Sequence, residues 1–242
     1  MNDSKTRFSR ILLKLSGEAL MGKGAFGIDP DILLYIAKEI EDIYKAGVKI
    51  TVVIGGGNFF RGFNSSSYGV NRIAGDHMGM LATIMNSLAL GETLSCIGIE
   101  SRVMSAIRMD TIAEPYIQQK AVKHLLNGRV VIVGAGTGNP YFTTDTAAVL
   151  RAIELASDVL IKATKVDGVF NSDPMKNPDA VKFKALTYKQ VLKDELRVMD
   201  LTAISLAMDN SLPIIVFDLH RQGSLKDIIL GKKIGTYIGS EA

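Results

Sequence analysis

The chain has 242 residues, of which 47% are hydrophobic and 22% are charged, and its formal net charge is +3. These values are typical of a globular protein that buries a full core in one domain or in two tightly joined lobes. They exclude a disordered or low-complexity chain. No block of like charges interrupts the sequence, so we expect no nucleic-acid partner.

The residues that report on cellular compartment are few. The single cysteine, Cys96, permits no internal disulfide, and the three histidines have no zinc-ligand spacing. The first apolar run ends at Lys14, too early for the core of a signal peptide, and no run is as long as a membrane span. We therefore expect a cytoplasmic protein without a membrane anchor or a metal ion held by protein ligands alone.

Short apolar runs alternate with longer segments of helical period along the whole chain, which is the pattern of an α/β protein. Most of the runs are apolar throughout, as in a parallel sheet that is covered on both faces. Asp29 and Pro30 mark the start of the first helix. The predicted strands are 10–15, 49–54, 102–105, 129–134, 158–162 and 213–217, and the predicted helices are 30–45, 72–93, 116–126, 144–156, 187–193, 201–209 and 224–230.

A long loop is predicted at residues 166–183, which are rich in Gly, Asn, Asp and Pro. Loops of this length in compact domains are usually functional. Glycine clusters also follow three of the predicted strands, at Gly17, at 55–57 and at 134–138. Because parallel strands end at one edge of a sheet, these turns predict a shared cleft in which backbone N–H groups bind phosphate. The alternative for each cluster is a tight turn without a ligand.

The familiar phosphate-binding motifs are missing. The sequence contains neither GxxxxGK[ST] nor the HRD and DFG strings of protein kinases. Residues 22–27 do spell GxGxxG, but they lie several positions beyond the first strand, and no acidic residue ends the second strand. An NAD-dependent oxidoreductase is therefore a weaker alternative, and an ordinary loop is the other interpretation of these glycines.

Charged residues beside the glycine turns are candidates for phosphate chemistry. Lys14 interrupts an apolar strand and needs an anion, unless its ammonium group reaches past the sheet edge into water. Arg61 can offer a bidentate fork to a phosphate, and its alternative is an exposed arginine. Asp76, Asp145 and Asp200 lie near predicted helix starts, where a carboxylate either binds ligand or complements the helix dipole, and Asp173 in the long loop has the same two interpretations. Dispersed aspartates suffice for Mg²⁺, which keeps substrate phosphates among its ligands.

The strings at 13–18, 53–62, 75–80, 136–145 and 162–169 resemble the bacterial uridylate kinases of the amino-acid-kinase family, and the match runs nearly end to end. The resemblance implies the reaction ATP + UMP → ADP + UDP. It also implies a three-layer αβα sandwich with a mainly parallel central sheet. Residues 1–242 would then form a single domain, with the N-terminal part mainly on the UMP side and the C-terminal part mainly on the ATP side.

The resemblance also assigns roles to individual positions. It implies that Lys14, Arg61 and Asp145 form the catalytic centre. The ATP contacts would be Lys14, Leu15, Ser16, Gly17, Gly57, Arg61, Thr164, Phe170 and Asp173. The UMP contacts would be Gly56, Asp76, Thr137, Gly138, Asn139, Pro140, Tyr141, Phe142, Thr143 and Thr144. The candidate effector contacts are Gly22, Lys23, Gly24, Ala25, Phe26, Gly27, Arg102 and Arg129.

The expected partners follow from the same resemblance. They are ATP, UMP and Mg²⁺ bound mainly through nucleotide phosphates, with UTP as inhibitor, GTP as activator and a homohexamer built from dimers. Gly91 and Ser95 stand where some relatives carry basic effector contacts, which leaves the GTP response open. One rival is a kinase of the same fold that phosphorylates a carboxylate or carbamate, and another is a non-catalytic nucleotide sensor. Asp76 with the loop at 137–144 argues against the first, and Lys14, Arg61 and Asp145 together argue against the second.

Overall fold

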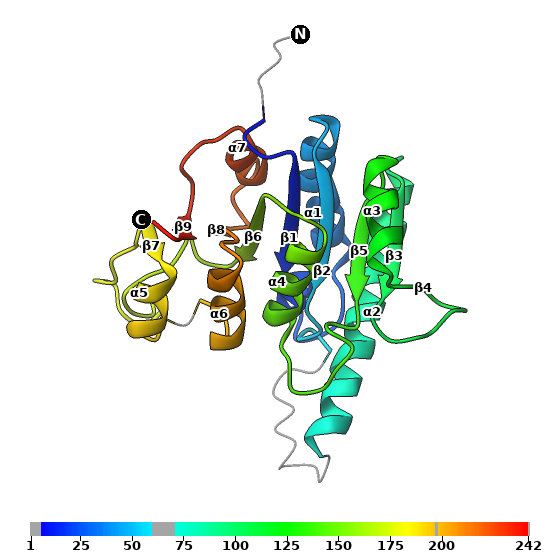
Figure 1. The fold of residues 1–242 in the computed structure, drawn as a ribbon, viewed down its shortest axis with the longest axis horizontal. Helices are drawn as coiled ribbons and strands as arrows, with labels where there is room; N and C mark the ends of the chain where they lie inside the picture. Colours follow the sequence, from blue (N-terminus) through cyan, green and yellow to red (C-terminus); the bar gives the residue numbers. More distant parts are fainter. Residues whose placement is uncertain (1–5, 60–70, 197, 242) are drawn as a thin grey trace.

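The computed structural model describes residues 6–59, 71–196 and 198–241. In this part of the chain, nine strands form one sheet in the order β4-β3-β5-β2-β1-β6-β8-β9-β7 (Figure 1). Neighbouring strands are parallel except for β8 and β9, which are antiparallel. The strands are β1 (Arg10–Leu15), β2 (Lys49–Ile54), β3 (Ser101–Ser105), β4 (Glu114–Pro115), β5 (Val130–Gly134), β6 (Val159–Thr164), β7 (Ala185–Thr187), β8 (Ile214–Asp218) and β9 (Thr236–Gly239).

Helices cover both faces of the sheet, so the expected three-layer αβα sandwich is confirmed (Figure 1). One face packs against α1 (Pro30–Lys45), α2 (Arg72–Cys96) and α7 (Ser224–Ile229). The other face packs against α3 (Gln118–Leu126), α4 (Thr144–Glu154), α5 (Tyr188–Lys193) and α6 (Leu201–Asp209). A short 3₁₀ helix, η1 (Gly17–Met21), follows β1.

Strand β1 shows why its sequence is apolar at nearly every position. Leu13 and Leu15 pack into the core on the side of α1, whereas Leu12 packs on the side of α4, and all three are fully buried. A strand buried on both faces cannot alternate apolar and polar residues. Lys14 is the exception and is itself 7% exposed.

The predicted helix starts are set by side-chain caps. Asp29 accepts hydrogen bonds from the N–H groups of Asp31 and Ile32, at 2.9 and 3.3 Å, just before Pro30. Asn71 caps α2 in the same way. Helix α4 ends two residues earlier than predicted, and Ala156 then has a left-handed φ of 50°, which no helix interior accepts.

The sequence did not predict four short elements. Residues 114–115 pair with β3 as β4, so the helix expected from residue 116 begins at Gln118. Strands β7 and β9 lie at the other margin of the sheet, and η1 forms where a turn was expected. The long loop at 166–183 is confirmed, with a single bridge between Phe170 and Lys182. No helix of the described segments is long and apolar enough to cross a bilayer.

Candidate active site

The glycine turns that follow β1 and β2 touch each other. A Cβ on Gly17 would lie 2.5 Å from the Gly55 carbonyl oxygen and 2.6 Å from the Gly57 nitrogen, so no side chain fits there. A Cβ on Gly55 would lie 3.1 Å from the Gly17 nitrogen and 3.7 Å from Thr144 Oγ1, at the start of α4. The structure therefore brings together turns from three separate parts of the sequence at one edge of the sheet.

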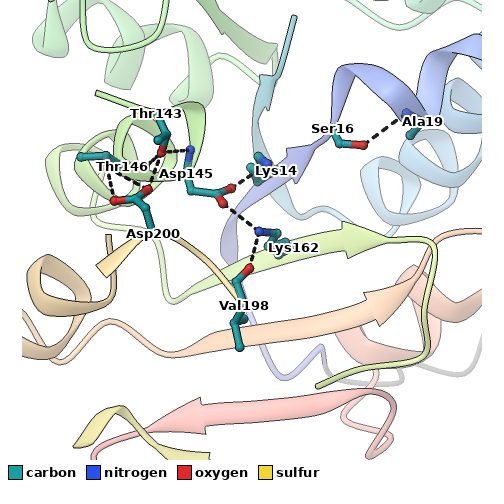
Figure 2. A network of polar contacts seen from close by, with 9 residues as sticks. All are labelled: Lys14, Ser16, Ala19, Thr143, Asp145, Thr146, Lys162, Val198 and Asp200. Carbon is teal, nitrogen blue, oxygen red and sulfur yellow. Dashed lines mark hydrogen bonds and ion pairs between the residues drawn. The ribbon is translucent and has the colours of Figure 1, made fainter. Parts of the chain in front are cut away.

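Two lysines meet one carboxylate beside these turns (Figure 2). Lys14 Nζ lies 2.6 Å from Asp145 Oδ1, and Lys162 Nζ lies 2.8 Å from Asp145 Oδ2. Lys14 and Lys162 are register partners on the adjacent parallel strands β1 and β6, and Asp145 lies in the first turn of α4. Their formal charges sum to +1, which favours an anionic ligand at this position.

Burial and ion pairing shift the pKa values of these groups in opposite directions. Burial alone would raise the pKa of Asp145, but the ammonium groups of Lys14 and Lys162 together lower it. Burial lowers the pKa of Lys162, and the attraction of Asp145 only partly offsets that effect. The ionised form of Asp145 is thus maintained by its two partners.

A second carboxylate fixes the start of α4. Asp200, the N-cap of α6, accepts hydrogen bonds from the hydroxyls of Thr143 and Thr146, the latter at 2.9 Å (Figure 2). Thr143 Oγ1 in turn accepts from the Asp145 N–H at 3.1 Å. Asp200 therefore joins α6 to the turn that carries Asp145.

A cavity of about 350 Å³ is lined in part by Thr143 and Thr144, the two residues before Asp145. It contains Gly56 and Gly57 from the second turn, Asp76 from α2 and a group of residues from the third turn. The lining residues are Gly56, Gly57, Arg72, Gly75, Asp76, Gly79, Met80, Thr83, Gly136, Thr137, Phe142, Thr143 and Thr144.

Six of the expected UMP contacts line this first cavity: Gly56, Asp76, Thr137, Phe142, Thr143 and Thr144. Residues 138–141 belong to the same loop but do not line the cavity. One of these residues, Tyr141, donates its N–H to Asp76 Oδ2 at 2.7 Å. Gly57, expected on the ATP side, also lines the first cavity.

A second cavity, of about 520 Å³, is lined by residues from β6, β8 and the long loop and by residues 194–196 and 198. It contains three expected ATP contacts, namely Thr164 at the end of β6 and Phe170 and Asp173 from the long loop. Its lining residues are Thr164, Val166, Gly168, Val169, Phe170, Asn171, Ser172, Asp173, Pro174, Lys176, Asp194, Glu195, Leu196, Val198 and Val216.

The lysine–aspartate centre neighbours lining residues of both cavities, although Lys14, Asp145 and Lys162 themselves line neither one. Asp145 follows Thr144, which lines the first cavity, and Lys162 donates a hydrogen bond to the carbonyl of Val198, which lines the second. The centre is therefore one residue along the chain from the lining of the first cavity and one hydrogen bond from the lining of the second.

Other predicted site residues lie elsewhere. Arg61 lies outside the described residues. Leu15 is fully buried, so only its backbone is available to a ligand. Ser16 caps η1 by accepting from the Ala19 N–H at 3.2 Å.

The candidate effector contacts divide into two places. Residues 22–27 follow β1 and η1 at the carboxyl edge of the sheet. Arg129 precedes β5, and Arg102 lies near the start of β3, both at the opposite edge. There Arg129 pairs with Glu100 at 2.9 Å, and Arg102 Nε lies 3.8 Å from Glu114. The structure does not bring these two groups together.

The sequence pointed to no role for Lys162, and it left Asp200 with two interpretations, of which the structure shows the helix-start carboxylate, as the N-cap of α6. Lys162 carries the same signal as Lys14, because each is a lone lysine in an apolar strand. The position of Asp200 before a helix was visible in the sequence, but its bonds to Thr143 and Thr146 were not, since these partners lie more than fifty positions away. Among the described residues, no group of three or more His, Cys, Asp or Glu side chains is arranged to hold a metal ion.

The sequence model of the amino acid kinase family matches residues 9–218, and the chain belongs to that family. It is 54% identical to the uridylate kinase of Legionella pneumophila strain Lens, and the match covers 99% of this chain and 98% of that protein. The crystal structure of UMP kinase from Bacillus anthracis is 43% identical, with a TM-score of 0.94 over 97% of both chains.

A more distant structure shares the fold alone. Aspartate kinase from Synechocystis is 18% identical, with a TM-score of 0.72 over 96% of this chain and 40% of that one. Together with the bacterial UMP kinase structure, it confirms the fold class that the sequence predicts.

Proposed function

We propose that this chain transfers the γ-phosphoryl group of ATP to UMP, giving ADP and UDP. The bond between the γ-phosphorus and the β,γ-bridging oxygen breaks, and an oxygen of the UMP phosphate forms the new bond. The structural observation that carries the proposal is the buried pair of lysines on one carboxylate, Asp145, which follows Thr144 of the first cavity, while Lys162 donates to the carbonyl of Val198 of the second. The names of its relatives, uridylate kinase and UMP kinase, support the choice of acceptor.

The residues at the centre suit this reaction. A nucleotide phosphate has a second pKa near about 6 and is mostly a dianion at neutral pH, so no general base is needed. Phosphoryl transfer then depends on alignment and on neutralising the charge that spreads over the transferring oxygens. Lys14 and Lys162 supply positive charge, and Asp145 holds both ammonium groups in place. We also retain Arg61 as a contact to both phosphates.

We assign the whole chain to one domain in which the two nucleotides meet head to head. UMP would occupy the first cavity, with Asp76 accepting its ribose hydroxyls and the loop at 137–144 around uracil and phosphate. ATP would occupy the second cavity, with Phe170 against the adenine side and residues 14–17 and Gly57 near its phosphates. Thr164 and Asp173 complete that side.

We infer that Mg²⁺ enters with ATP. Both carboxylate oxygens of Asp145 already lie against lysine ammonium groups. A cation that prefers oxygen ligands would therefore bind mainly through the β- and γ-phosphate oxygens, as Mg²⁺ commonly does. Its chemical contribution would be to neutralise charge on those oxygens.

Location, regulation and assembly complete the proposal. We assign the protein to the cytoplasm, as a homohexamer that UTP inhibits, with GTP as the candidate activator whose effect the assay decides. Arg102, Arg129 and the loop at 22–27 are the candidate effector contacts. A UDP-formation assay with each nucleotide added separately tests both regulators.

A coupled ADP-release assay tests the reaction itself. With ATP and Mg²⁺, we expect UMP to be the best acceptor in a panel that also contains CMP, dUMP, acetylglutamate and carbamate. Rapid ADP release with one of the two acids and none with UMP would replace this proposal by the rival acid-kinase function. Nucleotide binding without ADP release from any acceptor would indicate a sensor.

The variant Lys14→Met tests the centre. We expect kcat to fall by about 10²–10³-fold, because one charged contact to the transferring group is lost. The circular dichroism spectrum should stay that of the native protein, because methionine keeps the length of the buried stem. Turnover close to the native value would contradict the role of Lys14.

A further inference from the structure

Two fully buried asparagines form a closed amide pair beneath the second glycine turn. Asn58 Nδ2 donates to Asn86 Oδ1 at 2.8 Å, and Asn86 Nδ2 donates to Asn58 Oδ1 at 2.8 Å. Both residues are 0% exposed, and Asn86 lies in the middle of α2. A buried amide is costly unless its polar atoms are paired, so this arrangement needs a compensating role or a complete set of partners.

The remaining donors of the pair hold backbone carbonyls of the site. Asn86 Nδ2 donates to the Gly55 carbonyl at 2.7 Å, and Asn58 Nδ2 donates to the Gly27 carbonyl at 3.0 Å. The Gly27 N–H returns a hydrogen bond to the Asn58 carbonyl at 2.9 Å. The amide pair therefore ties α2 to the turn at 55–57 and to the end of the loop at 22–27.

The turn at 55–57, which the amide pair holds, also contacts the turn after β1. Gly17 packs against Gly55, Gly57 and Asn58 Oδ1, at 2.5–2.6 Å from the place that its Cβ would take. Gly56 and Gly57 line the first cavity. A shift of the Gly55 carbonyl would thus move both the turn after β1, next to Lys14, and the backbone that faces the acceptor.

We propose that Asn86 and Asn58 are positioning residues for phosphoryl transfer, which act by fixing the turn at 55–57 between the two nucleotides. This inference rests on the proposed function. Neither side chain lines either cavity, so their effect is on geometry. Misplacement of reacting groups by about 1 Å can cost 10²-fold in rate.

The test uses Asn86→Leu, Asn58→Leu and the double variant, each assayed as the intact protein. We expect each single change to lower kcat by about 50-fold, with KM for ATP unchanged within about threefold. Residues that act as a unit are non-additive, so the double variant should lose no more kcat than either single variant. Thr93→Val, which removes a hydroxyl further along α2, is the matched control and should keep native kcat.

Hydrogen–deuterium exchange provides a readout that does not depend on activity. Amides of residues 55–57 should exchange faster in Asn86→Leu than in the native protein, while those of β5 do not change. If the leucine variant fails to fold, Asn86→Ala takes its place, because the vacated polar site can admit water. Unchanged exchange with kcat within threefold of native, or losses that multiply in the double variant, would overturn the inference.

Failure of the proposed function gives a different result. In that case the native protein itself would not phosphorylate UMP, while the exchange measurement would still report whether the amide pair holds the turn.

Discussion

Asp145 is the residue on which the charge balance of the centre depends. It separates two buried ammonium groups that occupy register positions on adjacent strands. Removing one partner of a buried ion pair leaves uncompensated charge, which usually costs more than the pair itself contributes. We therefore expect Asp145 to serve both stability and, under the proposed function, ligand alignment, and the two roles respond to different measurements.

We predict that Asp145→Asn lowers the free energy of unfolding by about 3 kcal/mol at neutral pH, because Lys14 and Lys162 are left buried without their carboxylate. Urea denaturation followed by circular dichroism measures this loss. The matched variant Asp173→Asn, in the exposed loop, should change stability by no more than about 0.5 kcal/mol. Equal stability of native protein and Asp145→Asn would show that the carboxylate does not hold the lysines.

The stability lost in Asp145→Asn should also depend on pH. The two lysines lower the pKa of Asp145 below its ordinary value of 3.8. An acid whose pKa is lowered by folding adds stability above the unfolded pKa and loses it as the pH falls through the folded pKa. The difference in unfolding free energy between native protein and Asp145→Asn should therefore be constant from pH 7 to about pH 5 and shrink below about pH 4. A difference that shrinks above pH 5 would contradict this sign.

Among the elements, those with a long repeating pattern could be predicted from the sequence. Strands buried on both faces and helices with side-chain caps, such as α1 after Asp29, lie where the pattern places them. Strands β4, β7 and β9 have two to four residues, too few to show a period of two. Their formation depends on the neighbouring strand that they extend.

The residues of the candidate site also differ in whether a local sequence pattern reveals them. The sequence identified Lys14 and the glycine turns because each breaks a local pattern. Asn86 breaks none, and the helix-start position of Asp200 does not reveal its bonds to Thr143 and Thr146, since both side chains depend on partners elsewhere in the fold. Asn86 contacts Gly55 and Asn58 across 31 and 28 positions. Long-range pairing of this kind is visible only in three dimensions.

Helix α4 holds the third glycine turn through Arg151. This buried guanidinium donates to the Gly136 carbonyl at 3.3 Å and to Glu154 at 2.7 Å, and it lies 4.1 Å from the centre of the Tyr116 ring. Gly136 has a left-handed φ of 59° and lines the first cavity. The side chain therefore connects the body of α4 to the acceptor side of the site.

We predict that Arg151→Lys raises KM for UMP by about tenfold while KM for ATP stays within about twofold. A lysine keeps the charge but cannot stack and donate in two directions at once, so the Gly136 turn loses its support. Initial-rate kinetics with each nucleotide varied in turn measure the split. Arg108→Lys, at an exposed arginine, is the control and should change neither constant. Equal increases in both constants would assign Arg151 to general stability.

At the scale of the whole molecule, α2 has two distinct faces. Its inner face carries the buried residues Thr83 and Asn86, and Thr83 Oγ1 accepts from the Ala135 N–H at 2.7 Å. Its outer face carries Leu81, Met85 and Leu88, which are 47%, 43% and 37% exposed at helical spacing. An exposed apolar stripe on one helix suits an isologous contact with a second copy. The contact between copies would therefore lie on the outer face of α2, and the inner face of the same helix holds two of the glycine turns.

We predict that Met85→Glu reduces the molar mass of the assembly, because a charge placed between two copies would be desolvated without a partner. Size-exclusion chromatography with light scattering measures the mass at several protein concentrations. Leu34→Glu, which introduces the same charge at a 37% exposed leucine of α1, is the control and should leave the mass unchanged. Turnover should fall together with the mass, since Asn86 and Thr83 hold their turns from the other face of α2. An unchanged mass in Met85→Glu would place the contact between copies on another surface.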